Sequence, residues 1–246
     1  MADIGVVLLS AGSGRRMNSS VPKQYMDLCG KTVLRYSIEN FENAGAVKAI
    51  IIVTAENMIN DVWNNYVKPY NYKKVTQIIA GGKERYHSVY NGLLAMKGEG
   101  VDYVMIHDGA RPFAGEDMIN RLYEKVKECG ACIPAVPSKD TICVADKAGN
   151  VAKYPDRSFL WNVQTPQTFC YKAIKDAFDI FMKNEKEYYP VTDDAMVYKR
   201  VTGKEVAIAM GDYNNIKLTT PEDFDIAKRI VENEQNVYTI RTFTTI

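Results

Sequence analysis

Short apolar segments alternate with amphipathic stretches along most of the chain. The apolar segments end at glycine or polar residues, which is typical of buried strands, and they predict strands at residues 4–9, 48–54, 75–80, 102–107, 131–136 and 206–210. Between them, apolar residues recur at intervals of three and four, which predicts helices around residues 34–41, 59–66, 88–93, 119–126 and 174–181. The alternation predicts an α/β fold with helices on both faces of the sheet.

One segment interrupts this alternation. Residues 141–145 and 151–154 flank the polar stretch 146–150, and together they predict a β-hairpin. Two strands alone are barely stable in water, so an inserted hairpin packs against something else. The sequence leaves two alternatives open, a second subunit or the surface of the hairpin's own domain.

Length and composition favour a single domain over residues 1–246. The chain is 46% hydrophobic and 25% charged, with a formal net charge of +1. A charge so near zero argues against nucleic-acid and membrane-surface binding, whereas small acidic substrates remain open. No apolar stretch approaches the ~20 residues that span a bilayer, so a cytoplasmic protein is expected.

Five cysteines, an odd number, favour a reducing compartment. Cys129 and Cys132 form a C-x-x-C pair, but it falls where a helix ends, whereas redox pairs use a helix N-terminus. A structural role is therefore expected. With two histidines, His87 and His107, a histidine-rich metal centre is excluded.

The loop after the first strand, Leu8-Leu9-Ser10-Ala11-Gly12-Ser13-Gly14-Arg15-Arg16-Met17, is the main candidate for chemistry. Its small residues allow several backbone N–H groups to face one anion, and Arg15, Arg16 and Lys23 add local positive charge. A P-loop is excluded because no Lys-Ser or Lys-Thr pair follows, and Met17 replaces the third glycine of a dinucleotide fingerprint. By itself the loop is either a phosphate cradle of another kind or a plain turn.

Further polar residues follow other strands. Asp108 and Arg111 come directly after the strand at 102–107, where ligands bind in open α/β sheets. Asp108 could hold a divalent cation, orient a hydroxyl or cap a turn. Lys217 precedes a helix start at Thr220-Pro221, and is either a solvated loop residue or another phosphate cation.

The order and spacing of several blocks resemble the 2-C-methyl-D-erythritol 4-phosphate cytidylyltransferase family over nearly the whole chain. The blocks are the loop at 11–17, Pro22-Lys23-Gln24-Tyr25, Gly81-Gly82-Lys83-Glu84-Arg85 with Ser88-Val89, His107-Asp108-Gly109-Ala110-Arg111-Pro112, Pro137-Ser138-Lys139-Asp140-Thr141, Trp161 with Thr165-Pro166-Gln167, Thr192-Asp193-Asp194-Ala195, and Asn215-Ile216-Lys217. The resemblance implies a Rossmann-like nucleotidyltransferase sheet with an inserted β-hairpin arm at about 138–160 that forms a homodimer. It also implies attack of a sugar-alcohol phosphate on the α-phosphorus of CTP, with Mg²⁺ or another divalent cation on the triphosphate.

The resemblance also implies roles for particular residues. The triphosphate would be held by Arg16, Lys23 and Lys217, whose fixed charges suit phosphoryl-type transfer. The nucleotide side would be formed by Ala11, Gly12, Gly14, Gly82, Lys83 and Ser88. The acceptor phosphate would be held by Asp108, Arg111 and Thr141, joined by Arg157 and Thr165 from the partner's arm, with Asp108 also the candidate metal ligand.

Two departures keep other readings open. The family usually opens its loop with Pro-Ala-Ala-Gly, whereas Leu9-Ser10-Ala11-Gly12 stands here, and Lys83 replaces a common acidic residue. The Leu-x-Ala-Gly opening is similar to the sister family that acts on ribitol 5-phosphate, although Tyr25 and Gly109-Ala110 follow the methylerythritol pattern. A nucleotide-binding module without turnover is the alternative from another class, and Met17 disfavours a nicotinamide oxidoreductase.

Overall fold

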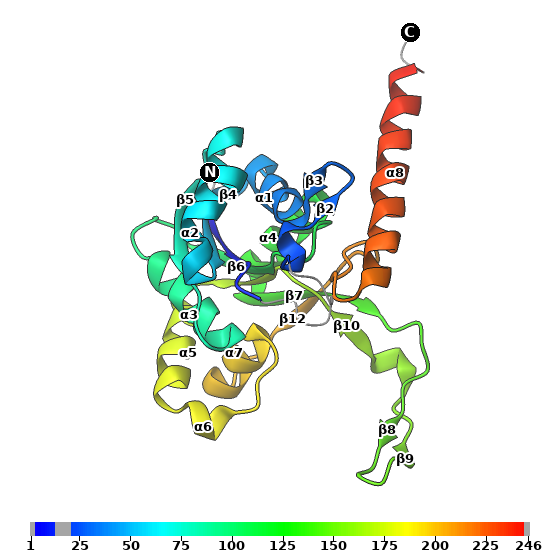
Figure 1. Ribbon diagram of the computed structural model, residues 1–246. Helices are drawn as coiled ribbons and strands as arrows, with labels where there is room; N and C mark the ends of the chain where they lie inside the picture. Colours follow the sequence, from blue (N-terminus) through cyan, green and yellow to red (C-terminus); the bar gives the residue numbers. More distant parts are fainter. Residues whose placement is uncertain (1–2, 13–20, 244–246) are drawn as a thin grey trace.

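A mixed β-sheet forms the centre of the molecule (Figure 1). The computed structural model describes residues 3–12 and 21–243, with side chains up to residue 233. The strands of the sheet are β1 (Ile4–Leu9), β4 (Val47–Thr54), β5 (Val75–Ala80), β6 (Tyr103–Asp108), β7 (Ala131–Pro137), β10 (Trp161–Val163), β11 (Gln167–Cys170) and β12 (Ala207–Met210). β1 pairs in parallel with β4 and β6, and β4 with β5, so these carboxyl ends share one edge.

One stretch of the sheet runs in the opposite direction. β11 lies between β6 and β7 and is antiparallel to both. β10 and β11 both pair with one edge of β7. β12 pairs in parallel with the opposite edge. The sequence pattern predicted a polar loop at 164–167 and missed these strands, since they are three and four residues long and begin with polar or exposed positions.

Helices cover both faces of the sheet, as the alternating pattern predicts (Figure 1). The helices are α1 (Val33–Asn43), α2 (Ile59–Asp61), α3 (Arg85–Ala95), α4 (Glu116–Cys129), α5 (Tyr171–Lys183), α6 (Glu185–Tyr188), α7 (Asp194–Thr202) and α8 (Pro221–Phe243). Along β1, Val6 and Leu8 face the cluster that contains α1 and α4, whereas Val7 faces the cluster that contains α3 and α5. This follows from the period of two along a strand.

Shorter elements complete the chain. A small ladder pairs β2 (Asp27–Leu28) with β3 (Lys31–Thr32), and 3-10 turns lie at Lys23–Tyr25, Glu56–Met58, Lys68–Tyr70 and Arg157–Phe159. The helix predicted around 59–66 is divided, because α2 continues into a π-helical segment, Val62–Val67.

The predicted hairpin is present. β8 (Val144–Ala145) pairs in antiparallel register with β9 (Val151–Lys153), and the Oδ1 atom of Asp146 accepts hydrogen bonds from the turn N–H groups of Ala148 and Asn150. Figure 1 shows the hairpin extending away from the sheet, and all of residues 139–154, including the strands β8 and β9, are exposed. Within one described chain the hairpin therefore does not lie on its own domain.

None of the helices formed by the described residues combines the length and apolar character that a bilayer crossing requires.

Candidate active site

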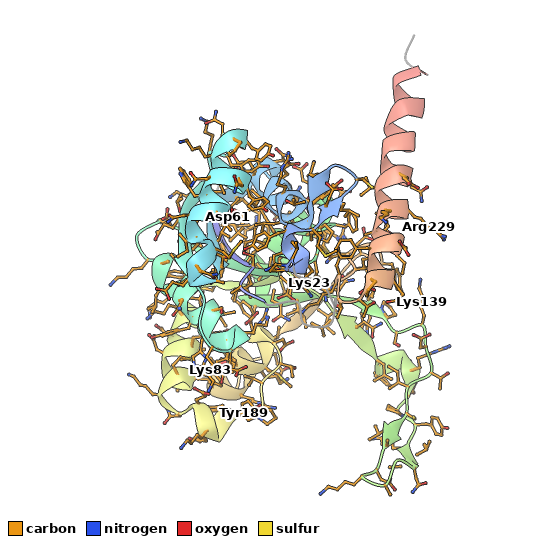
Figure 2. The ribbon with its side chains drawn as sticks, in the orientation of Figure 1. Lys23, Asp61, Lys83, Lys139, Tyr189 and Arg229 are labelled. Atoms are coloured by element: carbon orange, nitrogen blue, oxygen red, sulfur yellow. The ribbon has the colours of Figure 1, made fainter. Side chains whose placement is uncertain are left out.

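A cleft of about 790 Å³ opens at the carboxyl ends of β1, β5 and β6. Its lining residues are Leu9, Ser10, Ala11, Gly12, Lys23, Gln24, Gly82, Lys83, Glu84, Arg85, Ser88, Asp108, Ala110, Lys217 and Thr219. Lys23 and Lys83 come from separate segments, the turn before β2 and the loop before α3 (Figure 2). Sequence blocks that lie up to two hundred residues apart thus meet at the edge where open α/β sheets bind ligands.

The loop after β1 begins the cleft wall. The Ser10 N–H donates to the carbonyl of Val53 (2.7 Å), which continues the sheet by one residue. The Nε2 atom of Gln24 donates to the carbonyls of Ser10 (2.6 Å) and Gly12 (3.0 Å), so the turn that carries Lys23 is fixed against this loop. The predicted site residues Gly14 and Arg16 lie outside the described residues.

The loop between β5 and α3 forms the facing wall. Ser88 is buried on α3, and its Oγ atom accepts a hydrogen bond from the Gly82 N–H (3.0 Å). Gly81 is packed so closely that an added Cβ atom would lie 2.7 Å from the Cβ of Ala11. The backbones of the two loops therefore approach one another directly, and Lys83 is exposed at the rim.

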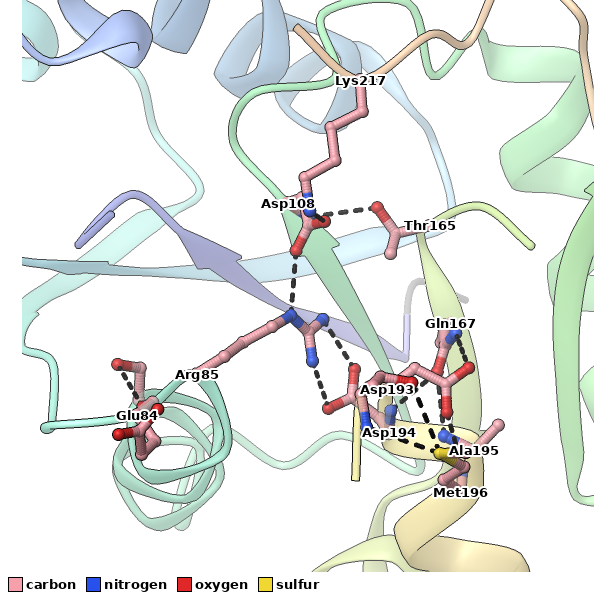
Figure 3. Close-up of polar contacts among 12 residues, drawn as sticks. Glu84, Arg85, Asp108, Thr165, Gln167, Asp193, Asp194, Ala195, Met196 and Lys217 are labelled. Carbon is pink, nitrogen blue, oxygen red and sulfur yellow. Dashed lines mark hydrogen bonds and ion pairs between the residues drawn. The ribbon is translucent and has the colours of Figure 1, made fainter. Parts of the chain in front are cut away.

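Asp108 ends β6 between two cations (Figure 3). Its Oδ1 atom accepts a hydrogen bond from Nε of Arg85 (3.1 Å), and its Oδ2 atom accepts one from Nζ of Lys217 (2.7 Å). Burial opposes ionisation, but the charges of Arg85 and Lys217 outweigh it and hold the pKa of Asp108 far below its ordinary range. Asp108 is therefore an ionised carboxylate with both oxygens engaged.

Arg85 and Asp194 are functional candidates that the sequence analysis does not assign a role. The Nη1 and Nη2 atoms of Arg85 donate to Oδ1 and Oδ2 of Asp194 (2.8 and 2.9 Å). Both residues stood in the blocks that carry the family resemblance, but Asp194 was interpreted as an acid in the first turn of a helix. That interpretation is confirmed for α7, which begins at Asp194, yet it missed the ion pair between elements.

Thr165 does not lie where the family resemblance implies. It is 5% exposed in its own chain, where its Oγ1 atom accepts a hydrogen bond from the Asp108 N–H (3.1 Å) and contacts Nδ1 of His107 (3.0 Å). The expectation that Thr165 reaches a site from the partner's arm is corrected, because this hydroxyl supports Asp108 from behind. Thr165 precedes β11, the antiparallel strand that the sequence pattern missed.

Arg111 lies beside the cleft and does not line it. Its Nη1 atom donates to the carbonyl of Asn215 (2.7 Å), whose Nδ2 atom donates to the carbonyl of Thr165 (2.8 Å). Among the described residues, Nε of Arg111 is buried without a hydrogen-bond partner. Burial lowers the pKa of Arg111. The guanidinium is thus held in place with donor capacity to spare.

Thr141 and Arg157 are separate from the cleft of their own chain. Both are exposed on the hairpin arm, and Arg157 donates to the carbonyl of Lys139 (3.3 Å). Figure 2 shows Lys139 at the base of the arm, well apart from Lys83.

Asp108 is also the residue at which the sequence predicts a metal site. Among the side chains of residues 3–12 and 21–233, no three His, Cys, Asp or Glu groups gather as a metal site would require. Asp108 is poorly suited to hold a metal ion in this arrangement, because the positive charges of Arg85 and Lys217 at its two oxygens would repel a cation.

The C-x-x-C pair keeps its structural interpretation. Cys129 closes α4, and Cys132 is buried in β7, where burial raises the pKa of its thiol. A raised pKa is the reverse of what a redox pair needs.

The fold and the lysine-rich, glycine-walled cleft define an α/β nucleotidyltransferase. The model of one protein family, IspD, 2-C-methyl-D-erythritol 4-phosphate cytidylyltransferase, matches residues 4–233. The chain belongs to the 2-C-methyl-D-erythritol 4-phosphate cytidylyltransferase family, and it is an enzyme of the nucleotidyltransferase class.

Curated relatives carry the same name. The protein from Lachnoclostridium phytofermentans is 41% identical over 236 residues, which cover 96% of this chain and 99% of the relative. The protein from Lachnospira eligens is 45% identical over 221 residues, which cover 90% and 96%.

Solved structures agree in fold. A 4-diphosphocytidyl-2C-methyl-D-erythritol synthase from Anaerococcus prevotii superposes with a TM-score of 0.79 at 29% identity, covering 94% of this chain and 96% of that one. The Francisella tularensis 2-C-methyl-D-erythritol 4-phosphate cytidylyltransferase gives a TM-score of 0.76 at 31% identity, covering 92% and 98%.

Proposed function

We propose that this enzyme joins CTP to 2-C-methyl-D-erythritol 4-phosphate, giving 4-diphosphocytidyl-2-C-methyl-D-erythritol and pyrophosphate for isoprenoid precursor biosynthesis. A phosphate oxygen of the acceptor attacks the α-phosphorus of CTP, and the bond from that phosphorus to the pyrophosphate leaving group breaks. The observation that carries the proposal is the cleft, where glycine backbone and the amines of Lys23, Lys83 and Lys217 face one volume. Such transfer needs little covalent participation by the protein, so positioning and fixed charge do most of the work.

On the nucleotide side, the backbone of Ala11, Gly12, Gly82 and Lys83, together with Ser88, would recognise cytidine. Backbone donors do not depend on side chains, so the departures at Ser10 and Lys83 leave them intact. Lys23 and Lys217 would hold the triphosphate, and Arg16 and Gly14, outside the described residues, are proposed to join them.

On the acceptor side, Asp108 would orient hydroxyl groups, and Arg111, next to the cleft, would bind the phosphate with the part of its guanidinium that does not donate to Asn215. Thr141 and Arg157 are exposed on an arm that leaves its own domain, so we propose that they complete the acceptor site of a second copy in a homodimer. Thr165 is assigned instead to the support of Asp108.

A divalent cation, Mg²⁺ in the simplest case, would be carried by the triphosphate, where it neutralises charge on the leaving group. CTP and a sugar-alcohol phosphate are small polar metabolites, and we place the enzyme in the cytoplasm.

The test is pyrophosphate release from CTP with 2-C-methyl-D-erythritol 4-phosphate or ribitol 5-phosphate, measured side by side in buffer with Mg²⁺. We expect release with the first acceptor, and Lys23→Ala should lower kcat/KM by roughly 10²–10³, the scale for loss of one preorganised charge donor. Lys97→Ala, at an exposed lysine away from the cleft, is the control and should leave kcat/KM unchanged. Release with ribitol 5-phosphate alone, or CTP binding without release, would overturn the assignment.

A further inference from the structure

Four charged side chains from four segments form a row, and three of them, Arg85, Asp108 and Lys217, line the cleft (Figure 3). The row runs from Asp194 at the start of α7, through Arg85 at the start of α3 and Asp108 at the end of β6, to Lys217. Charges alternate along it, so every neighbouring pair attracts. The row also runs from the interior outward, since the side chain of Asp194 is 1% exposed and that of Lys217 is 39% exposed.

Arg85 divides its guanidinium between two carboxylates. Nη1 and Nη2 form a bidentate pair with Asp194, and Nε is left for a single bond to Asp108. Bidentate pairing fixes the plane of the guanidinium, so it also fixes the direction from which Nε reaches Asp108. Asp108 accepts this bond at Oδ1 and therefore presents Oδ2 to Lys217.

Asp194 is itself held firmly. Its backbone N–H and that of Ala195 donate to Oε1 of Gln167 (3.1 and 2.9 Å), which is 1% exposed on β11. The next residue back, Asp193, caps the same helix by accepting from the Met196 N–H (2.8 Å). The start of α7 is thus anchored to β11, a strand that neighbours β6.

We propose that Asp194 is a positioning residue, which acts through Arg85 to fix the orientation of the Asp108 carboxylate and the place of Lys217. The inference rests on the proposed function, in which Asp108 meets the acceptor. Asp194 does not line the cleft, so it cannot touch a substrate there. Without its charge, the Nη edge of Arg85 would turn to the remaining carboxylate, Asp108, occupy both oxygens and displace Lys217.

The test is steady-state kinetics of Asp194→Asn with CTP and 2-C-methyl-D-erythritol 4-phosphate varied in turn. We expect the acceptor KM to rise roughly tenfold, the scale of a lost charge-assisted hydrogen bond, while the CTP KM changes less than about twofold. Asp193→Asn is the matched control, because it alters the same helix terminus without touching Arg85. It should lower Tm and leave the acceptor KM as it is.

Arg85→Lys tests the link between the two carboxylates, since one amine cannot pair with Asp194 and Asp108 in the same fixed geometry. It should raise the acceptor KM alone, and adding Asp194→Asn to it should raise that KM no further, because coupled residues are not additive. If Asp194→Asn does not fold, the acceptor KM of Arg85→Lys tests the positioning role instead.

Three results would overturn the positioning role: an unchanged acceptor KM in Asp194→Asn or in Arg85→Lys, equal effects of Asp194→Asn and Asp193→Asn, or additive effects in the double variant. In all three cases the wild-type enzyme would still release pyrophosphate, so the proposed function would stand. Absence of pyrophosphate release by the wild-type enzyme would instead reject the proposed function, and the positioning role with it.

Discussion

At the scale of single residues, Asp108 is held from its backbone as well as from its carboxylate. Its N–H donates to Thr165, the Thr165 hydroxyl donates to Nδ1 of His107, and Nε2 of His107 donates to the carbonyl of Arg111 (3.0 Å). The carbonyl can only accept, which fixes the proton of neutral His107 on Nε2. His107 is fully buried against the ring of Phe41, and burial lowers its pKa to about 4.

This histidine makes stability depend on pH. Between about pH 6.5 and pH 4, His107 takes up a proton in the unfolded chain but not in the folded one, so its contribution to the free energy of unfolding falls as the pH falls. The loss over that window is on the order of 3 kcal/mol. We expect the wild-type protein to lose more stability than His107→Gln between pH 7 and pH 4.5, measured by urea unfolding. Equal losses would show that His107 is not held neutral.

At the scale of elements, the junctions between strands and helices shape the cleft. Gly81 directly follows β5 and packs against the loop after β1. A Cβ atom added at Gly81 would lie 2.7 Å from Cβ of Ala11 and 2.8 Å from Oγ of Ser88. The Ala11 methyl group has no freedom to move aside without its backbone, so the two walls of the cleft would have to separate.

Gly81→Ala should therefore raise the KM for CTP several-fold and lower the free energy of unfolding by about 1–3 kcal/mol, the usual cost of overpacking. Gly45→Ala is the control, since a Cβ atom there meets nothing within 4 Å. CTP kinetics and urea unfolding of both variants provide the measurement. A Gly81→Ala enzyme with the CTP KM of the wild type would show that the contact between the loops is not needed.

The sequence predicted those elements whose pattern is local. The buried strands β1, β4 and β6 and the helices α4 and α5 were all expected from apolar spacing and are confirmed. β11 was not, because a four-residue strand with two polar positions has no clear period. The pair of Arg85 with Asp194 was missed for another reason: the two are 109 residues apart, and only the tertiary fold brings the starts of α3 and α7 together.

At the scale of the whole molecule, the arm exposes more apolar surface than a lone chain would favour. Val151 is 51% exposed, Tyr154 67% and Phe159 80%. Several large apolar side chains exposed on one projecting arm favour an interaction site, and a second copy of the chain is the partner we propose.

Phe159→Ser should weaken association of the copies and raise the acceptor KM, because the phenyl ring contributes little to the fold of its own chain. Sedimentation across a range of protein concentrations measures the first effect. Ile180→Ser, at a residue 46% exposed on α5, is the control and should leave association as it is. A Phe159→Ser protein with the molecular mass and kinetics of the wild type would contradict the dimer.

The path of the chain around the arm has a practical outcome. β7 ends at Pro137, which pairs with Trp161 where the chain returns, so the arm departs from and rejoins the sheet at the margin that also bears the cleft. In a dimer joined through the arms, both active sites would lie next to the interface between the two copies. A small molecule that bound at this interface and separated the two copies would then inhibit the enzyme without resembling either substrate.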